Sequence, residues 1–171
     1  KEDVSNSAQR QVGALIAGQS VDIQTTDLNQ SHGHIAAGGP LNINAKGAVQ
    51  GSGSYSGGTS VAVVAGNIDL ANASVQSAGW LKLQTTQGEL NLTATQVKAA
   101  GDATLQSAGA LNLTAQKHEA HVVRGDGSKK DEVKFETTNI QAGGKATLTS
   151  AGDLTAQGST ITAGQDLKVQ S

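Results

Sequence analysis

Histidines are the first candidates for metal or acid–base chemistry in this sequence. His32 and His34 would share one face of an extended strand, and His118 and His121 lie three residues apart in a charged stretch. Each pair offers two ligands, whereas zinc normally takes four, and no third ligand accompanies either pair. We therefore predict no metal site, no catalytic residue and no cofactor, and we interpret the histidines as solvated surface residues.

A second candidate is the tripeptide Arg124, Gly125, Asp126, which can act as an adhesion signal. It lies within "HVVRGDGSKKDEVKF", and residues 117–136 hold five of the twelve Lys and Arg and five of the fourteen Asp and Glu. Exposed loops carry function, but a three-letter match has a high false-positive rate. We favour a soluble, charge-rich hairpin and keep the tripeptide as a candidate adhesion motif.

N-glycosylation sequons form a third set of candidates. Two of them fall in an L-N-L-T pattern, in which a strand places Asn outward, so we interpret the motif as a by-product of a repeat and make no prediction about modification. The sequons begin at Asn29, Asn72, Asn91 and Asn112.

The composition excludes several classes of protein. The net charge is −2, and no clustered basic face is present, which argues against nucleic acid as a partner. No apolar run approaches a membrane span of roughly 20 residues, and no signal peptide is visible. The chain has no Cys and no Met, so we expect no disulfide and interpret the chain as a segment of a longer protein.

Apolar pairs two residues apart recur along the chain. The interval is 20 residues for the first four pairs, then 22, 43 and 21. The pairs are Val21/Ile23, Leu41/Ile43, Val61/Val63, Leu81/Leu83, Ala103/Leu105, Ala146/Leu148 and Leu167/Val169. A repeat of about 20 residues is typical of stacked architectures.

Three further columns keep this register. A small residue follows each pair by two positions, as at Thr25, Ala65 and Ser107, and Gly or Ala precedes each pair by three. A large apolar residue stands six positions before each pair: Leu15, Ile35, Tyr55, Val75, Val97, Ile140 and Ile161. Second apolar segments such as Leu90/Leu92 and Leu111/Leu113 complete the unit.

A spacing of two is the strand period, so each unit reads as three short strands joined by tight corners. Such a unit buries its apolar face only by stacking on its neighbours. We predict an all-β fold, a right-handed parallel β-helix of about eight coils of 20–22 residues, covering residues 12–171 after a polar N-terminal segment, residues 1–11. A leucine-rich repeat has a similar period but requires a helical segment, for which the sequence has no pattern.

The interval of 43 residues predicts one further coil with a charged protrusion at about residues 118–136. Counting from the neighbouring coils places its first strand at residues 122–124 and its second at Val133 and Phe135. The intervening "GDGSKKD" has no inward-facing candidate, so we expect it to project as a hairpin tip.

Parallel β-helices include polysaccharide lyases and hydrolases, whose sites need acids stacked in adjacent coils. The acids Asp22, Asp69, Asp102 and Asp166 do not align in this way. We therefore predict that the protein is not an enzyme.

Segments such as "AGALNLTA" and "AGGKATLTSAGDLTAQGSTITAGQDLKVQS", with the charged interruption that contains His118 and His121, resemble the haemagglutinin repeats of filamentous haemagglutinin-like exoproteins. That group includes two-partner secretion adhesins and the toxin-delivery proteins of contact-dependent growth inhibition. The resemblance implies a β-helical filament, secreted to a bacterial cell surface through an outer-membrane partner transporter.

We therefore interpret the chain as a structural stalk segment that presents distal binding or toxin domains. Its expected partners are the transporter, a receptor on a host or target cell, and the adjoining coils of the parent chain. The alternative is a β-helical carbohydrate-active enzyme or glycan-binding module, which a stacked row of acids or aromatics on one outer face would favour.

Overall fold

Alternating side chains make the repeat units into strands. In β2 (Val21–Thr25), Val21 and Ile23 are buried and Asp22 is exposed, and the same alternation recurs throughout the coils. The computed structural model describes residues 14–171. Within this range the regular secondary structure consists of β-strands alone. No helix among these residues is long and apolar enough to cross a membrane.

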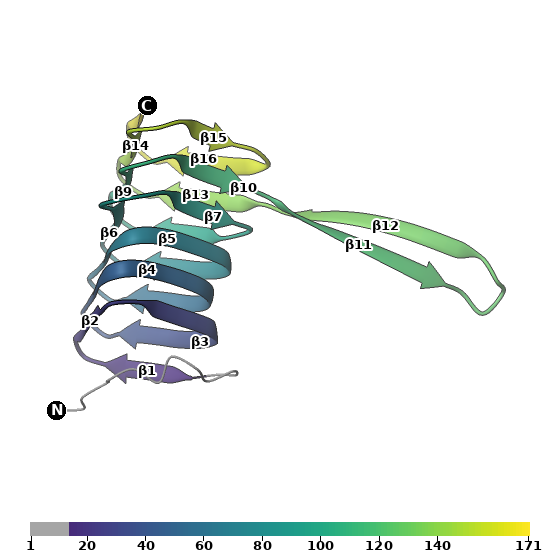
Figure 1. Ribbon diagram of the computed structural model, residues 1–171, viewed down its shortest axis with the longest axis horizontal. Helices are drawn as coiled ribbons and strands as arrows, with labels where there is room; N and C mark the ends of the chain where they lie inside the picture. The colour runs from purple at the N-terminus through teal and green to yellow at the C-terminus, as the bar shows by residue number, and fades with distance from the viewer. Residues whose placement is uncertain (1–13) are drawn as a thin grey trace.

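The strands form three parallel faces that wind around one axis (Figure 1). The first face contains β2, the starts of β4 (Pro40–Gly57) and β5 (Ser60–Ser77), β6 (Trp80–Thr85), β9 (Ala103–Ser107), β14 (Ala146–Ser150) and β17 (Leu167–Gln170). The second contains the start of β3 (Leu28–Ala37), the middles of β4 and β5, β7 (Leu90–Thr93), β10 (Leu111–Thr114) and β15 (Leu154–Ala156). The third contains β1 (Leu15–Gly18), the ends of β3, β4 and β5, β8 (Gln96–Ala99), β13 (Thr138–Ala142) and β16 (Ser159–Ala163).

These faces confirm the predicted parallel β-helix. In Figure 1 the chain climbs from β1 to β17 as a right-handed coil, which is the hand expected for parallel crossovers. The described coils make about seven turns rather than eight. One predicted coil is therefore absent.

The missing coil is explained by the pairing of β9 with β14. Ala103 pairs directly with Ala146, and Leu105 with Leu148, so the interval of 43 residues is a single turn. An ordinary turn here spans 21 residues, as from Leu90 to Leu111, so 22 residues are inserted. The interval resembled two periods only because the insertion is about as long as one coil.

Stacked aliphatic columns fill the interior. Leu41, Val61 and Leu81 lie in register on successive turns of the first face, and each is at most 1% exposed. Because each side chain contacts the equivalent side chain above and below, the core runs continuously along the axis. The column of large apolar residues on the third face is buried at Ile35, Tyr55, Val75, Val97 and Ile140.

Three assigned core positions are exposed at the two ends of the described coils. Leu15 is 68% exposed, because Ile16 rather than Leu15 pairs with Ile35 and takes the inward place. The following corner is one residue shorter than in later coils, which shifts the spacing to Val21. Leu167 and Val169 are about half exposed, because β17 pairs with β14 on one side only within the described range.

Buried hydroxyls occupy the corner between the first and second faces. Thr85 Oγ1 donates to the Gly88 carbonyl at 2.7 Å, and Ser107 Oγ donates to the Ala110 carbonyl at 2.8 Å. Ser150 Oγ donates in the same way to the Gly152 carbonyl at 2.9 Å. The column of small residues thus adds side-chain hydrogen bonds to carbonyls at the bend, of which those of Gly88 and Ala110 also accept amides from the adjacent turn.

The column of Gly and Ala residues lies at the corner between the third and first faces, where backbones crowd. A Cβ built on Gly58 would stand 1.9 Å from the Gly38 carbonyl oxygen, and one on Gly143 2.2 Å from that of Ala100. Left-handed residues cluster at another corner, between the second and third faces, with φ of 55° at His32 and Asn72 and 48° at Ala94.

Tyr55 replaces an aliphatic residue in the third-face column and is 1% exposed. Its hydroxyl finds no hydrogen-bond partner among residues 14–171, and burial raises its pKa far above the ordinary value.

Tyr55→Phe is therefore expected to leave thermal stability unchanged or to raise it by about 1 kcal/mol, since the change removes an unpaired buried hydroxyl. Tyr55 is the sole tyrosine, so alkaline titration at its absorbance reports it alone. Since the folded-state pKa is raised, stability should fall as pH rises above about 10. Titration of Tyr55 in the folded protein at its ordinary pKa would contradict its burial.

Candidate functional site: a charged hairpin

A hairpin formed by β11 (Gln116–Val123) and β12 (Lys129–Glu136) leaves the coil at the corner between the second and third faces. Figure 1 shows it standing away from the coils as a separate two-stranded sheet. Thr138 closes its base, because its Oγ1 donates to the Thr114 carbonyl at 2.7 Å. The coil below therefore continues from β10 to β13 as though the insertion were absent.

This arrangement corrects the predicted strand positions in the charged stretch. Val122, Val133 and Phe135 were expected to point into a coil, but they lie in the hairpin and are 46%, 50% and 62% exposed. This hairpin is the charged protrusion of the predicted fold, and its strands run from Gln116 to Glu136. Its tip is shorter than "GDGSKKD", since β12 already begins at Lys129.

The register of the hairpin divides its side chains between two faces. Directly opposed pairs include His121 with Asp131 and His118 with Lys134, and successive pairs alternate in direction. His121 lies three positions after His118, and an odd offset along a strand places the two side chains on opposite faces. Their side chains therefore do not approach one another.

All four contacts between acidic and basic side chains of the described residues lie in this hairpin, and the two that involve histidine are ion pairs only when the imidazole is protonated. They are Lys117–Glu119 at 2.5 Å, His118–Glu136 at 3.3 Å, His121–Asp131 at 2.7 Å and Lys134–Glu132 at 3.7 Å. Their side chains are between 43% and 75% exposed, so solvent screens each pair and its contribution to stability is small. The charged side chains are solvated, as the sequence predicted.

The candidate adhesion motif forms the turn at the tip. The Gly127 amide donates to the Arg124 carbonyl and the Arg124 amide donates to the Ser128 carbonyl, both at 2.9 Å. Gly127 has φ of +85°, as expected for the residue that follows the turn in a short hairpin loop. The three motif residues are exposed, so Asp126 has both a turn-forming role and access to solvent.

Asp126 caps this turn. Its Oδ1 accepts hydrogen bonds from the Ser128 hydroxyl at 2.6 Å and the Ser128 amide at 2.9 Å. Both bonds favour the carboxylate and hold the pKa of Asp126 below its ordinary value.

Ser128→Ala is expected to raise the Asp126 pKa part of the way toward the ordinary value, because the hydroxyl bond is lost while the amide bond remains. Since the folded-state pKa is lowered, the cap is present above the ordinary carboxyl range and lost as pH falls through the lowered pKa. NMR titration of the Asp126 carboxyl carbon measures this. An unchanged pKa in the variant would show that the hydroxyl does not hold the carboxylate.

The other sequence candidates are dispersed over the coils. His34 Nδ1 contacts Ser54 Oγ, and His32 Nδ1 lies 3.0 Å from Ser31 Oγ. No group of three potential metal ligands occurs within residues 14–171. Asn91 and Asn112 face outward on the second face, where the Asn112 amide donates to Asn91 Oδ1 at 2.7 Å. Neither pair assembles a reactive site.

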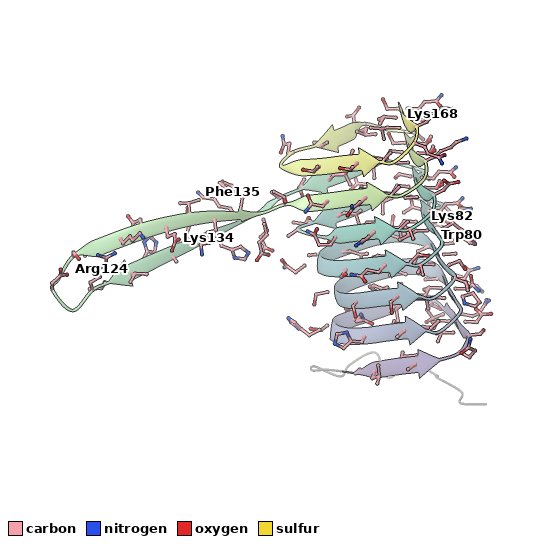
Figure 2. The ribbon with its side chains drawn as sticks, turned by 180° about the vertical axis from the view of Figure 1, so that it is seen from behind. Trp80, Lys82, Arg124, Lys134, Phe135 and Lys168 are labelled. Carbon is pink, nitrogen blue, oxygen red and sulfur yellow. The ribbon has the colours of Figure 1, made fainter. Side chains whose placement is uncertain are left out.

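Aspartates on the coils instead accept hydrogen bonds from backbone amides of the adjacent turn. Asp102 Oδ1 accepts from the Lys145 amide and Asp27 Oδ1 accepts from the Ala48 amide, each at 2.8 Å. A shallow depression on the first face is lined by neutral residues, including Gln84, Gln106 and Thr149. Figure 2 shows Trp80 and Lys82 together on this side of the rod, far from the hairpin.

A repeated motif marks the true boundaries of the insertion. "LNLTA" occurs at residues 90–94 and 111–115, and "TQVKA" at 95–99 corresponds to "TNIQA" at 138–142. Aligning these segments identifies residues 116–137 as the inserted stretch.

Deletion of residues 116–137 is therefore expected to leave the melting temperature nearly unchanged, because it joins Ala115 to Thr138 at the spacing of Ala94 and Thr95. Circular dichroism melting curves of the deletion and the wild type provide the measurement. A deletion of the same length that begins ten residues earlier removes β9 and β10 residues and should unfold the neighbouring coils. Equal loss in both deletions would show that the hairpin supports the coil.

Family comparison gives the affiliation of these coils. The hemagglutinin repeat model matches residues 71–122 and 123–171, which together are more than half of the chain. The chain belongs to the hemagglutinin repeat family. Searches of curated proteins and of solved structures each found no match. The boundary between the two matched segments falls at the end of β11, inside the hairpin.

Hemagglutinin repeats are structural, adhesin-type repeats rather than an enzyme family. The family implies a secreted or cell-surface exoprotein of the filamentous haemagglutinin type, in which such a segment belongs to the stalk. The resemblance read from the sequence is thus confirmed at the level of the family and the fold.

Proposed function

We propose that this chain is a length of stalk that carries distal binding or toxin domains away from a bacterial surface. The observation that carries the proposal is the unbroken parallel ladder, which joins all seven turns on the first face through β2, β4, β5, β6, β9, β14 and β17. Such a ladder propagates by nearest-neighbour contacts, so length is added one coil at a time.

Export through an outer-membrane partner transporter fits this architecture. Because each coil pairs with the coil that precedes it, the coils can fold one after another as the chain emerges. The chain has no cysteine, so no disulfide has to form during that process. The proposed distal function is either adhesion to a receptor or delivery of a growth-inhibiting toxin.

The stalk proposal is tested by building a chimera in cells that carry a two-partner transporter. One copy or two tandem copies of residues 1–171 are placed between the matching secretion domain and a terminal reporter domain. Seven additional turns should move the reporter outward by about 34 Å at 4.8 Å per turn, measured by electron microscopy of labelled reporter. Equal distances for one and two copies would contradict a stalk.

A carbohydrate-active or glycan-binding module was the alternative. That function needs a row of acids or aromatics on one outer face, and the described outer faces of the coils carry Trp80 as their single exposed aromatic side chain. Turnover of anionic polysaccharides by the purified chain would nevertheless refute the stalk as its sole function.

The stalk proposal does not include receptor binding by the candidate adhesion motif at the hairpin tip, and a separate experiment tests that motif. Asp126→Glu keeps the charge but moves the carboxylate outward, which would disturb a receptor that binds this group through a metal ion. We expect cell attachment by the chain to be the same before and after this change, with Ser128→Ala as the matched turn control. Selective loss of attachment in Asp126→Glu would assign Arg124, Gly125 and Asp126 to receptor binding.

A further inference from the structure

The outer edge of β12 is an unpaired strand edge. The hairpin is a two-stranded sheet on its own, and such a sheet is only marginally stable in water. Exposed edge groups are available for pairing with another strand. Figure 2 shows β12, with Lys134 and Phe135, extending clear of the coils.

The tip determines which residues of β12 present their backbone groups to this edge. In an antiparallel ladder, residues that exchange hydrogen bonds alternate with residues whose N–H and C=O point away. The Arg124 amide donates to the Ser128 carbonyl, so this pair belongs to the bonded class. The register then runs without a bulge to Gln116 and Glu136, which leaves the backbone groups of Lys129, Asp131, Val133 and Phe135 pointing outward.

The side chains of β12 alternate in charge along one face. Lys130, Glu132, Lys134 and Glu136 follow one another at strand spacing on the face opposite to Val133. Rotation of the strand by 180° about Val133 places Lys130 opposite Glu136, and Glu132 opposite Lys134. Four cross-strand ion pairs therefore form if two copies of β12 meet around this residue.

We propose that β12 is a docking edge for β12 of a second copy of this chain, antiparallel and centred on Val133. In this register the outward backbone groups of Val133 meet those of the second Val133, and those of Asp131 meet those of Phe135. The hydrogen-bonding class and the charge pattern therefore select the same register. The product is a four-stranded sheet that joins two stalks side by side, a property beyond the presentation of distal domains.

No other register of β12 forms all four ion pairs. Centring on Phe135 or on Asp131 keeps the hydrogen-bonding class but forms only two ion pairs, and centring on Asp131 also opposes two aspartates. Centring on Glu132 opposes Glu132 to itself and Lys130 to Lys134, and centring on Lys134 likewise opposes like charges. On β11, centring on Glu119 opposes two glutamates and places Lys117 opposite His121. Self-complementarity is therefore greatest for β12 in the register centred on Val133.

Cysteine cross-linking tests the register, since the chain contains no native cysteine. Bonded antiparallel residues have Cα atoms about 5.5 Å apart, which lies within the disulfide range of about 4.4–6.8 Å. Val133→Cys is expected to form a disulfide-linked dimer on mild oxidation. Val123→Cys, which is 68% exposed on β11, is the matched control and should remain monomeric. Equal cross-linking of the two variants would overturn the proposal.

Exchange of the charges on β12 tests whether its partner is β12 of a second copy. One variant carries Lys130→Glu with Lys134→Glu, and a second carries Glu132→Lys with Glu136→Lys. Each is expected to sediment as a monomer, because like charges face one another in its dimer, whereas an equimolar mixture should form a one-to-one dimer. Circular dichroism verifies that the coils of both variants are folded.

The association state of the wild-type chain provides a further test. Wild-type chain that stays monomeric at its highest soluble concentration refutes the docking edge. Wild-type association that both charge variants retain assigns self-association to another surface, such as the ends of the coils. A mixture of the two charge variants that remains monomeric is likewise incompatible with the proposed pairing.

Discussion

Val61→Asp is expected to unfold the β-helix or to lower its stability by about 3–5 kcal/mol, the loss typical of an uncompensated buried charge. Val61 is fully buried between Leu41 and Leu81 in a column that holds no polar partner. Denaturant unfolding followed by circular dichroism measures the change in free energy. Burial of a carboxyl group costs less when the group is protonated. The loss of unfolding free energy caused by Val61→Asp should therefore become smaller as pH falls.

Ala62→Asp is the matched control for this prediction. Ala62 is the next residue of β5 and points outward, where its neighbours in register are Asn42 and Lys82. A carboxylate there stays solvated, and the free energy of unfolding should change by less than about 0.5 kcal/mol. Equal loss of stability in the two variants would mean that the inward and outward positions of the first face are wrongly assigned.

Gly51→Ala is expected to destabilise the protein by about 3 kcal/mol. Gly51 lies in β4 with φ of +118°, and a Cβ at this position would stand 1.8 Å from the Gln30 carbonyl oxygen. Backbone strain and steric overlap each contribute roughly 1–3 kcal/mol at such sites. Gly53, two residues later and with φ of +111°, approaches the buried Gln30 side chain. The Nε2 atom of Gln30 donates to the Gly33 and Ser54 carbonyls at 3.1 and 3.2 Å.

Gly125→Ala is the control for the glycine substitution. No atom lies within 4 Å of a Cβ built on Gly125, so the change should be nearly silent in denaturant unfolding. If Gly51→Ala were also silent, the backbone near Gln30 would have to relax freely, and the close approach of β3 and β4 would not be a constraint on the fold.

The coil was predictable because burial imposes the same demand at each turn. Val61 must lie under Leu81 and over Leu41, so the sequence repeats its apolar pairs at the length of one turn. The same logic failed at Leu15, where a corner shortened by one residue moves Ile16 into the column. The length of an individual corner cannot be predicted from the pattern of apolar residues.

The hairpin was predictable in character but not in topology. Val122, Val133 and Phe135 alternate as coil residues do, and alternation alone does not reveal whether anything covers the apolar face. The pairing of His121 with Asp131 depends on the cross-strand register, which follows from where the turn lies. The turn itself was signalled by Asp126 and Gly127, since Asp-Gly is a frequent hairpin pair.

The direction of the ladder hydrogen bonds determines how the rod responds to tension. These bonds join one turn to the next, as between β9 and β14, and therefore run along the rod axis. A pull along the axis loads the turns in series, so any turn that has a neighbour on one side only is expected to yield before turns that lie between two neighbours. Each released turn of 21 residues lengthens the chain by roughly 70 Å at about 3.3–3.6 Å per residue. We therefore expect the coils to be stiff at low force and to lengthen one turn at a time when they are stretched along the axis.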